Sequence, residues 1–428
     1  MRPRAGIDPC ADARARRARK PGRHDLFRAL PPRSRPAPEP DRAPGRAGSS
    51  PPGGARTATA RIEALDLARL LAILGMMAVH LLAPLALDPA STGIQGHLAR
   101  AADALAAGSA STLFAVIGGC SLVLATRRPL ARGECGRAVA SVLVRGACVT
   151  LLGLVLELAP TSVMVVLVPF GLSMMLTAPL LLVPSRVLVP LLGVLALGGA
   201  PLAAAVPGPV EFGTVTLLSL DDPVGVLRGL VLTGQYPLIT WVPYLLLGIV
   251  LMRGLLRAQQ HGDPVRSSRQ MLLAGAVTAA AGHALPLLAA ALGHATPGAW
   301  YTAAPHTGTL GDMLATAGLS AAVLGALTWA LPAGRQLQSR TARTLRAAGA
   351  APLSIYVGHV LLTTAALLLA VVASGGELTS MPWYVAGVGV LGVHVVLTLA
   401  LGAVLAARGG RGPLEALVAR TVRRLTRV

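Results

Sequence analysis

The stretch LDLARLLAILGMMAVHLL, residues 65–82, is apolar enough to cross a membrane, yet it contains Asp66, Arg69 and His80. An α-helix turns about 100° and rises about 1.5 Å per residue. The three side chains therefore fall within a sector of about 60°, with His80 about 20 Å from Asp66 along the axis. Because charge facing lipid is costly, we expect this polar stripe to face protein or a water-filled cavity.

A structural explanation for each of these residues stays open beside the functional one. Asp66 suits the first turn of a helix, and Arg69 can extend its charge to the lipid headgroups. His80 can be a hydrogen-bonded histidine between helices.

A second group of polar residues occurs in WYTAAPHTGTLGD, residues 300–312. His306 lies between Pro305 and Thr307, and histidine is the side chain best suited to move a proton near neutral pH. Asp312 can either orient His306 or cap the following helix. The alternative is a solvated loop histidine with no role in chemistry.

Aromatic side chains gather in TGQYPLITWVPY, residues 233–244, which contains Tyr236 and Trp241. They form either an interfacial aromatic belt or a stacking wall for a sugar ring. His359 lies deep in a later apolar segment, as do two further histidines, His283 and His394. Several histidines at membrane depth indicate a polar path for substrate between helices.

The segments that must position these residues are apolar runs of about twenty residues. The chain is 54% hydrophobic and 13% charged, whereas a soluble protein carries roughly a quarter charged residues. Alternating ten-residue segments typical of a transmembrane barrel are absent. We predict an all-α, polytopic transmembrane helical bundle of about ten spans. The expected spans lie near 64–86, 106–126, 139–159, 162–183, 187–206, 237–256, 271–293, 312–333, 350–373 and 383–406.

The net charge of +20 comes largely from arginines at both termini and in alternate loops between the spans. This is the positive-inside pattern, so we expect both termini in the cytosol and the lipid bilayer, rather than nucleic acid, as the partner. Three longer loops then face outward, near 87–105, 207–236 and 294–311. We expect a multi-pass protein of a bacterial-type plasma (cell) membrane.

Composition divides the chain into three parts. Residues 1–60 are rich in Arg and Pro and are expected to be a disordered cytosolic tail. Residues 61–406 form the transmembrane domain, and residues 407–428 a basic cytosolic tail. No P-loop, dinucleotide fingerprint or zinc motif occurs, so no metal and no permanently bound cofactor is implied.

The first apolar block, RIEALDLARLLAILGMMAVHLL, resembles the opening of the heparan-alpha-glucosaminide N-acetyltransferase catalytic-domain family in its bacterial branch. Later blocks, among them LTGQYPLITWVPYLLLGIVLMR and APLSIYVGHVLL, look like further parts of that branch. The C-terminal RGPLEALVARTVRR is similar to a signature of related bacterial membrane proteins of unknown function. The resemblance spans residues 61–428.

The resemblance implies an acyltransferase that moves an acetyl group from cytosolic acetyl-CoA, or another acyl-CoA, to an amino or hydroxyl group of a saccharide on the far side. Asp66, Arg69, His80 and His306 occupy matching motif positions. From their depth we assign Arg69, with Asp66, to the CoA end. We assign His306 or His80, with Asp312, to catalysis as general base or acyl carrier.

The sequence departs from the family at two places: Leu70 follows Arg69 where glycine is usual, and Ala416 follows Pro-Leu-Glu where an aromatic residue is common. Both put the substrate in question. Two other functions are consistent with the sequence. One is a membrane transporter or exporter whose path is lined by the same residues, and the other is a non-catalytic membrane scaffold. The oligomeric state stays open, with a homodimer as one option.

Overall fold

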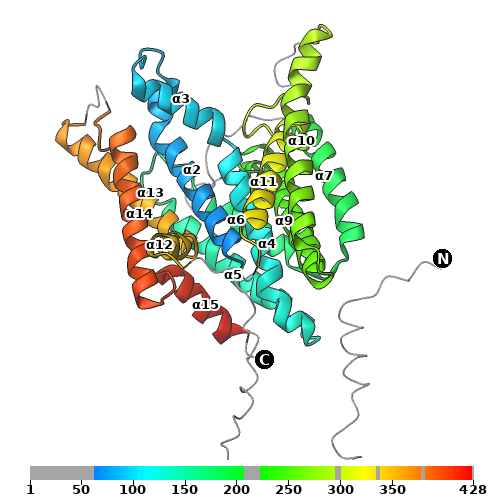
Figure 1. Cartoon of the computed structure of the whole chain (residues 1–428). Helices are drawn as coiled ribbons and strands as arrows, with labels where there is room; N and C mark the ends of the chain where they lie inside the picture. The colour runs from blue at the N-terminus through cyan, green and yellow to red at the C-terminus, as the bar shows by residue number, and fades with distance from the viewer. Residues whose placement is uncertain (1–61, 207–221, 295–299, 334–337, 377–380, 427–428) are drawn as a thin grey trace, which may run out of the picture.

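The computed structural model describes residues 62–206, 222–294, 300–333, 338–376 and 381–426. The only regular secondary structure in these ranges is helical, and no strand occurs there, so the expected all-α class is confirmed. The helices stand side by side as a bundle (Figure 1). The expected disordered tail, residues 1–60, lies outside the described part of the chain.

Nine helical segments in the described residues are long and apolar enough to cross a membrane. The chain is therefore a multi-pass membrane protein, as its composition predicts. The helices of these segments are α2 (Glu63–Leu87), α4 (Ser109–Ala131), α5 (Cys135–Leu156), α7 (Ser185–Ala205), α9 (Leu238–Gln260), α10 (Pro264–Ala291), α11 (Leu310–Ala330), α13 (Pro352–Ala373) and α14 (Val388–Arg408). The segment that contains α4 begins earlier, at Ile94, and includes the preceding helix α3 (Ile94–Ala106).

The span expected at 162–183 is shorter than a full crossing. It consists of α6 (Leu167–Thr177) followed by the 3-10 turn η2 (Pro179–Leu182). Pro179 lacks a backbone N–H and ends the regular α-helix. Long spans in the described ranges thus number nine rather than ten, with this shorter apolar segment in the place of the tenth.

The connection expected to be the first long outer loop, near 87–105, is also not a simple loop. Residues Ile94–Ala106 form helix α3, which packs against α2. Its alanine-rich sequence has high helix propensity, and Gly93 precedes it in an extended conformation. The connection before α9 contains two short helical turns, α8 (Pro223–Arg228) and η4 (Gly229–Thr233).

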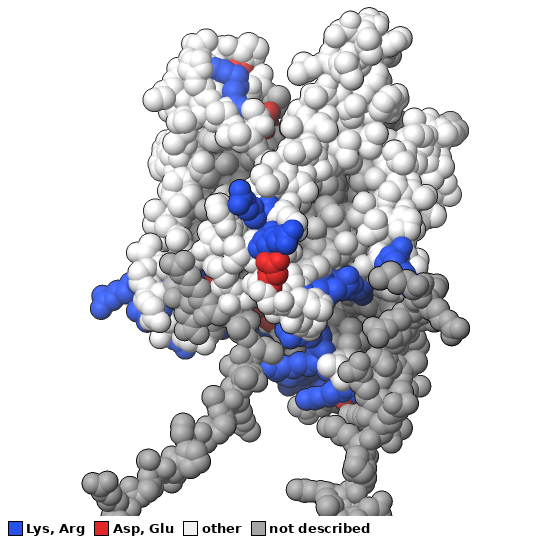
Figure 2. Space-filling view, turned by 45° about the vertical axis from the view of Figure 1, so that its right-hand side comes forward, with Lys and Arg blue, Asp and Glu red and all other residues white. Residues whose placement is uncertain are grey.

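Two short amphipathic helices lie at one end of the bundle, α12 (Arg340–Gly349) and α15 (Pro413–Leu425) (Figure 1). The segment expected as a basic tail from residue 407 thus contains a helix, which packs against α5. Arginine side chains gather toward the same end of the molecule, and the broad opposite part carries few (Figure 2). We call this the basic end.

Helix α12 fixes the start of α2. Arg346 pairs with Glu63 at 2.5 Å between Nη1 and Oε1. Gly349 lies so close to α2 that a Cβ atom there would be 1.8 Å from the Asp66 carbonyl oxygen. The first turn of α2, which carries Asp66 and Arg69, is therefore held in place by its neighbour.

Candidate functional site

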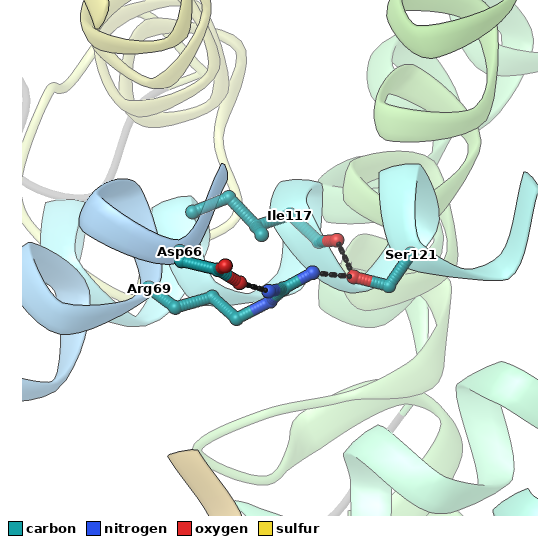
Figure 3. Close-up of polar contacts among 4 residues, drawn as sticks. All are labelled: Asp66, Arg69, Ile117 and Ser121. Carbon is teal, nitrogen blue, oxygen red and sulfur yellow. Dashed lines mark hydrogen bonds and ion pairs between the residues drawn. The ribbon is translucent and has the colours of Figure 1, made fainter. Parts of the chain in front are cut away.

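Arg69 points into the bundle from α2 and is held by α4 (Figure 3). Its Nη1 donates to Asp66 Oδ1 at 2.5 Å and its Nη2 donates to Ser121 Oγ at 2.8 Å. Ser121 in turn donates to the Ile117 carbonyl at 2.6 Å. Arg69 is thus fixed between two helices rather than extended toward headgroups. The buried Asp66 carboxylate orients Arg69.

A cavity of about 260 Å³ opens beside Arg69 at the basic end. A second cation, Arg145 of α5, lines it, and Arg411 lies within electrostatic range of Arg145. Most of the remaining wall is apolar and includes Phe114 and Phe170, whose rings lie 5.0 Å apart. The cavity therefore combines guanidinium groups, which bind phosphate or carboxylate, with an apolar interior.

Glu415 of α15 closes one side of this cavity. Its Oε1 accepts hydrogen bonds from the backbone N–H groups of Leu353 and Ser354, at 2.6 and 3.1 Å. Its Oε2 accepts from Ser354 Oγ at 2.6 Å, and Ser354 Oγ accepts from the N–H of Leu414. A carboxylate here caps the N-terminus of α13 and complements its dipole. The Pro-Leu-Glu motif therefore attaches α15 to the bundle.

The loop that carries His306 lies at the opposite end of the bundle. His306 has φ = 62° and is, within the described residues, the only non-glycine residue with positive φ. The neighbouring Gly308 has φ = 63°, and a Cβ atom there would be 2.5 Å from Thr240 Cγ2. A strained backbone held by tight packing is often found at functional sites.

Asp312 supports this loop from the first turn of α11. Its Oδ2 accepts from the Gly308 N–H at 3.0 Å. Its own N–H is bonded to the Thr302 carbonyl at 3.0 Å and to Thr309 Oγ1 at 3.3 Å. Asp312 therefore holds the backbone beside His306. Its Oδ1 is buried without a hydrogen-bond partner.

The expected aromatic residues meet His306. The Tyr236 ring lies edge on to His306, with centroids 5.3 Å apart, and edge on to Trp241 at 5.0 Å. Burial lowers the pKa of His306 to about 4 and raises the pKa of Tyr236 above its ordinary value. At neutral pH His306 is therefore a neutral imidazole, and Tyr236 keeps its proton.

A small cavity of about 20 Å³ lies between this loop and α9, lined among others by His306, Asp312, Trp241 and Tyr244. It has room for about one water-sized group. Asp312, whose Oδ1 is buried without a hydrogen-bond partner, is therefore one of the residues around a space of this size.

Three histidine side chains contact one another in a row next to this site. His80 Nδ1 and His359 Nε2 lie 3.3 Å apart, and the His359 ring meets the His394 ring edge on at 4.9 Å. His80 also lies within electrostatic range of His306. Within the described residues no group of three His, Cys, Asp or Glu side chains is placed to hold a metal ion.

The predicted site residues thus form two groups, one near each end of α2. Arg69 and Asp66 lie at the basic end, while His80 lies eleven residues and about 16 Å further along α2. His359, His306, Asp312, Tyr236 and Trp241 belong to the second group. His283 has an exposed side chain on α10 and is not among the ring contacts of the described histidines.

Sequence reasoning missed the contributions of Arg145 and Glu415. Arg145 lies in an expected span, and an arginine ten residues inside the apolar segment 135–156 is itself a signal for an enclosed polar site. Glu415 belongs to a quoted motif, yet its role depends on a contact with α13 some sixty residues away. Spacing in the sequence does not reveal such a contact.

These features define a class: a multi-pass helical membrane protein with a cationic cavity at one end of a shared helix and a histidine-rich site at the other. The sequence pattern of the family described as heparan-alpha-glucosaminide N-acetyltransferase, catalytic, matches residues 61–289, more than half of the chain. The chain belongs to this family. The match includes Asp66, Arg69, His80, Tyr236 and Trp241, whereas His306 lies beyond it. No individually curated protein matches the chain.

Proposed function

We propose that the protein transfers an acyl group from a cytosolic acyl-CoA to an amino or hydroxyl group of a saccharide or other acceptor at the opposite membrane face. The family is one of membrane N-acetyltransferases. The observation that carries the proposal is the placement of Arg69 and His80 on one helix, each within a separate polar site. Acetyl-CoA is the donor we propose first.

The cavity at the basic end suits the donor. Arg69 is oriented by Asp66 and Ser121, so its guanidinium is ordered before a ligand arrives. Arg69 and Arg145 supply positive charge for CoA phosphates, and the apolar wall with Phe114 and Phe170 accommodates the rest of the donor. In this assignment the basic end faces the cytosol, as the positive-inside pattern predicts.

The opposite site suits the transfer step. The acceptor nitrogen or oxygen attacks the thioester carbonyl carbon, and the C–S bond breaks as the new C–N or C–O bond forms. The neutral imidazole of His306 or His80 takes the acceptor proton, and CoA leaves as a thiolate that is then protonated. Tyr236 and Trp241 form an aromatic wall beside His306 that can stack on a sugar ring.

His359 pairs with His80 and so belongs to the second group of residues in this proposal. Its ring nitrogen fixes the orientation of the His80 imidazole. Asp312 acts through the backbone of the loop, by holding Gly308 and thereby His306. We place the protein in the plasma membrane, with both termini in the cytosol.

Binding of acetyl-CoA to the full-length protein in nanodiscs, measured by calorimetry, tests the donor half of the proposal. We expect saturable binding that weakens at least about tenfold in Arg69→Ala, the equivalent of about 1.4 kcal/mol. Arg137→Ala is the matched control, since Arg137 forms an exposed pair with Glu134 at the same end. No binding of acetyl-CoA or longer acyl-CoAs by folded protein would contradict the proposal and favour a transporter.

A further inference from the structure

An apolar groove of about 460 Å³ lies between α7, α9, α10 and α11. Its lining is made mainly of leucine, alanine and methionine side chains and contains no Asp, Glu, Lys, Arg or His. Along α11 it extends from Leu310 to Ala321, which corresponds to about 16 Å. Its shape and chemistry suit a hydrocarbon chain rather than a polar ligand.

The groove adjoins the His306 site, and one side chain lines both. Tyr244 lines the groove and also lines the small cavity with His306 and Asp312. Its hydroxyl is bonded to Thr316 Oγ1 at 3.0 Å. Two consecutive residues of α11 also border the two spaces: Met313 lines the groove and Asp312 lines the small cavity. A ligand with an apolar chain and a polar head would match this arrangement.

The groove lies between the two spans that the rest of the protein covers least. Only 11% of the most apolar window of α7 is buried, and the same holds for α10. Helix α7 packs chiefly against α9, and α10 against α11. In a membrane, the outer faces of α7 and α10 meet lipid, so a chain in the bilayer reaches the groove by lateral movement.

We infer that the groove binds the hydrocarbon chain of a lipid-linked acceptor, whose amino- or hydroxyl-bearing headgroup is thereby placed at His306. This inference rests on the proposed function, because it names the class of acceptor. The acceptor is then a glycolipid of the same membrane, which enters sideways between α7 and α10. The position of Tyr244 in both linings and the absence of charged side chains from the groove favour this occupant over a free sugar.

The probe for this inference is a dodecyl glucosaminide that carries a diazirine at the end of its chain. Full-length protein in nanodiscs is irradiated with the probe, and the labelled peptides are mapped by mass spectrometry. We expect labels on residues of the groove, on α7, α10 and α11. A phosphatidylcholine with the same diazirine in its acyl chain shows how much labelling bulk lipid gives.

Two alanines of α10 provide a matched pair of variants. Ala274 lines the groove, whereas Ala276, two residues further, does not, and both side chains are exposed on the helix. Ala274→Phe fills the groove and is expected to lower labelling and kcat/KM for the dodecyl glucosaminide at least about tenfold. Ala276→Phe is expected to change neither more than about twofold. Acetylation of methyl glucosaminide is expected to be the same in both.

Three outcomes would overturn the inference. The first is labelling of the groove by the phosphatidylcholine probe as strong as by the glucosaminide, which indicates bulk lipid alone. The second is acetylation of methyl and dodecyl glucosaminides with equal kcat/KM, which leaves the acyltransferase proposal intact. The third is equal behaviour of Ala274→Phe and Ala276→Phe. Groove labelling that Ala274→Phe abolishes, without acyl transfer, would support lipid binding and contradict the proposed function instead.

Discussion

His80 and His359 stack across the interface of α2 and α13, with ring planes 7° apart and His80 Nδ1 3.3 Å from His359 Nε2. His394 of α14 meets His359 edge on. The His394 Nδ1–H donates to the Val390 carbonyl at 2.9 Å, because a carbonyl can only accept. Three helices thus contribute one histidine each to a single contiguous chain.

The first prediction concerns the contribution of the His80–His359 pair to acyl transfer. His359→Ala leaves the His80 imidazole without this partner, so we expect kcat for acyl transfer to fall by about 10²-fold while acetyl-CoA binding is unchanged. The control is Thr363→Ala, one turn further along α13, whose hydroxyl donates to the His359 carbonyl at 2.9 Å. A folded His359→Ala protein with kcat within threefold of wild type would remove His359 from the site.

The depressed pKa of His306 predicts the acidic limb of the activity profile. Burial lowers this pKa to about 4, whereas an exposed histidine titrates near 6.5. If His306 is the general base, kcat/KM should fall as the pH is lowered, with an apparent pKa nearer 4 than 6.5. Titration of kcat/KM between pH 4 and 8 checks this, and a limb at 6.5 or above would assign the base to another group.

The same pKa has a consequence for stability. The unfolded chain binds a proton at His306 near pH 6.5, and the folded chain only near pH 4. The stabilising contribution of neutral His306 is therefore complete above about pH 6.5 and is lost as pH falls toward 4. Thermal unfolding of His306→Gln in nanodiscs should depend less steeply on pH in this range than that of wild type. Identical slopes would show that His306 is exposed in the membrane-bound protein.

Glycine and alanine variants at position 306 distinguish the role of the backbone conformation from that of the imidazole ring. At φ = 62° glycine is unstrained, whereas alanine keeps a strain of about 1–3 kcal/mol. We expect His306→Gly to unfold at a temperature at or above that of His306→Ala. Both variants should lose acyl transfer by about 10²-fold or more, because both lack the imidazole. Substantial activity in the glycine variant would show that the loop shape, and not the ring, is required.

Asp312 should act through the loop. Asp312→Asn keeps an oxygen that can accept from the Gly308 N–H, whereas Asp312→Ala leaves this buried donor without a partner, at a cost of about 1–3 kcal/mol. We expect the alanine variant to have a lower Tm and a lower kcat, and the asparagine variant to recover most of both. If both variants are equally inactive at normal Tm, the carboxylate charge itself takes part in the reaction.

Glu415 should fasten α15 to the basic end. Glu415→Ala removes the acceptor of three hydrogen bonds at the start of α13, with an expected cost of about 1–2 kcal/mol. Faster trypsin cleavage at the arginines of α15 would show its release. Glu134→Ala is the control, since Glu134 forms a partly exposed ion pair that is worth little. Equal cleavage rates in the two variants would contradict this role.

Helical periodicity was sufficient to predict that Asp66, Arg69 and His80 share one face of α2. The stripe of Asp66, Arg69 and His80 follows from the geometry of α2 alone, and its two depths match the two groups of residues in the structure. The all-α bundle follows from the apolar runs. Local composition does not reveal that α6 is short, because its length depends on where α5 ends and on Pro179.

Contacts between distant segments could not be predicted from the sequence. The pairing of His80 with His359 joins residues 279 positions apart, and the Glu415 cap joins residues about sixty apart. The sequence suggested that Asp312 orients His306 or caps α11. In the structure its backbone N–H is capped by Thr309, and its carboxylate holds Gly308. That division depends on the path of the loop, which spacing does not determine.

Transfer across a sealed membrane tests the central claim most directly. Proteoliposomes trap methyl glucosaminide, radiolabelled acetyl-CoA is added outside, and acetylated acceptor and released CoA are measured on each side. We predict that the trapped acceptor becomes acetylated while an equal amount of CoA appears outside. At subsaturating acetyl-CoA both should fall at least about tenfold in Arg69→Ala and about 10²-fold or more in His306→Gly. Movement of the acceptor without CoA release, or transfer only when both substrates share one side, would contradict the account.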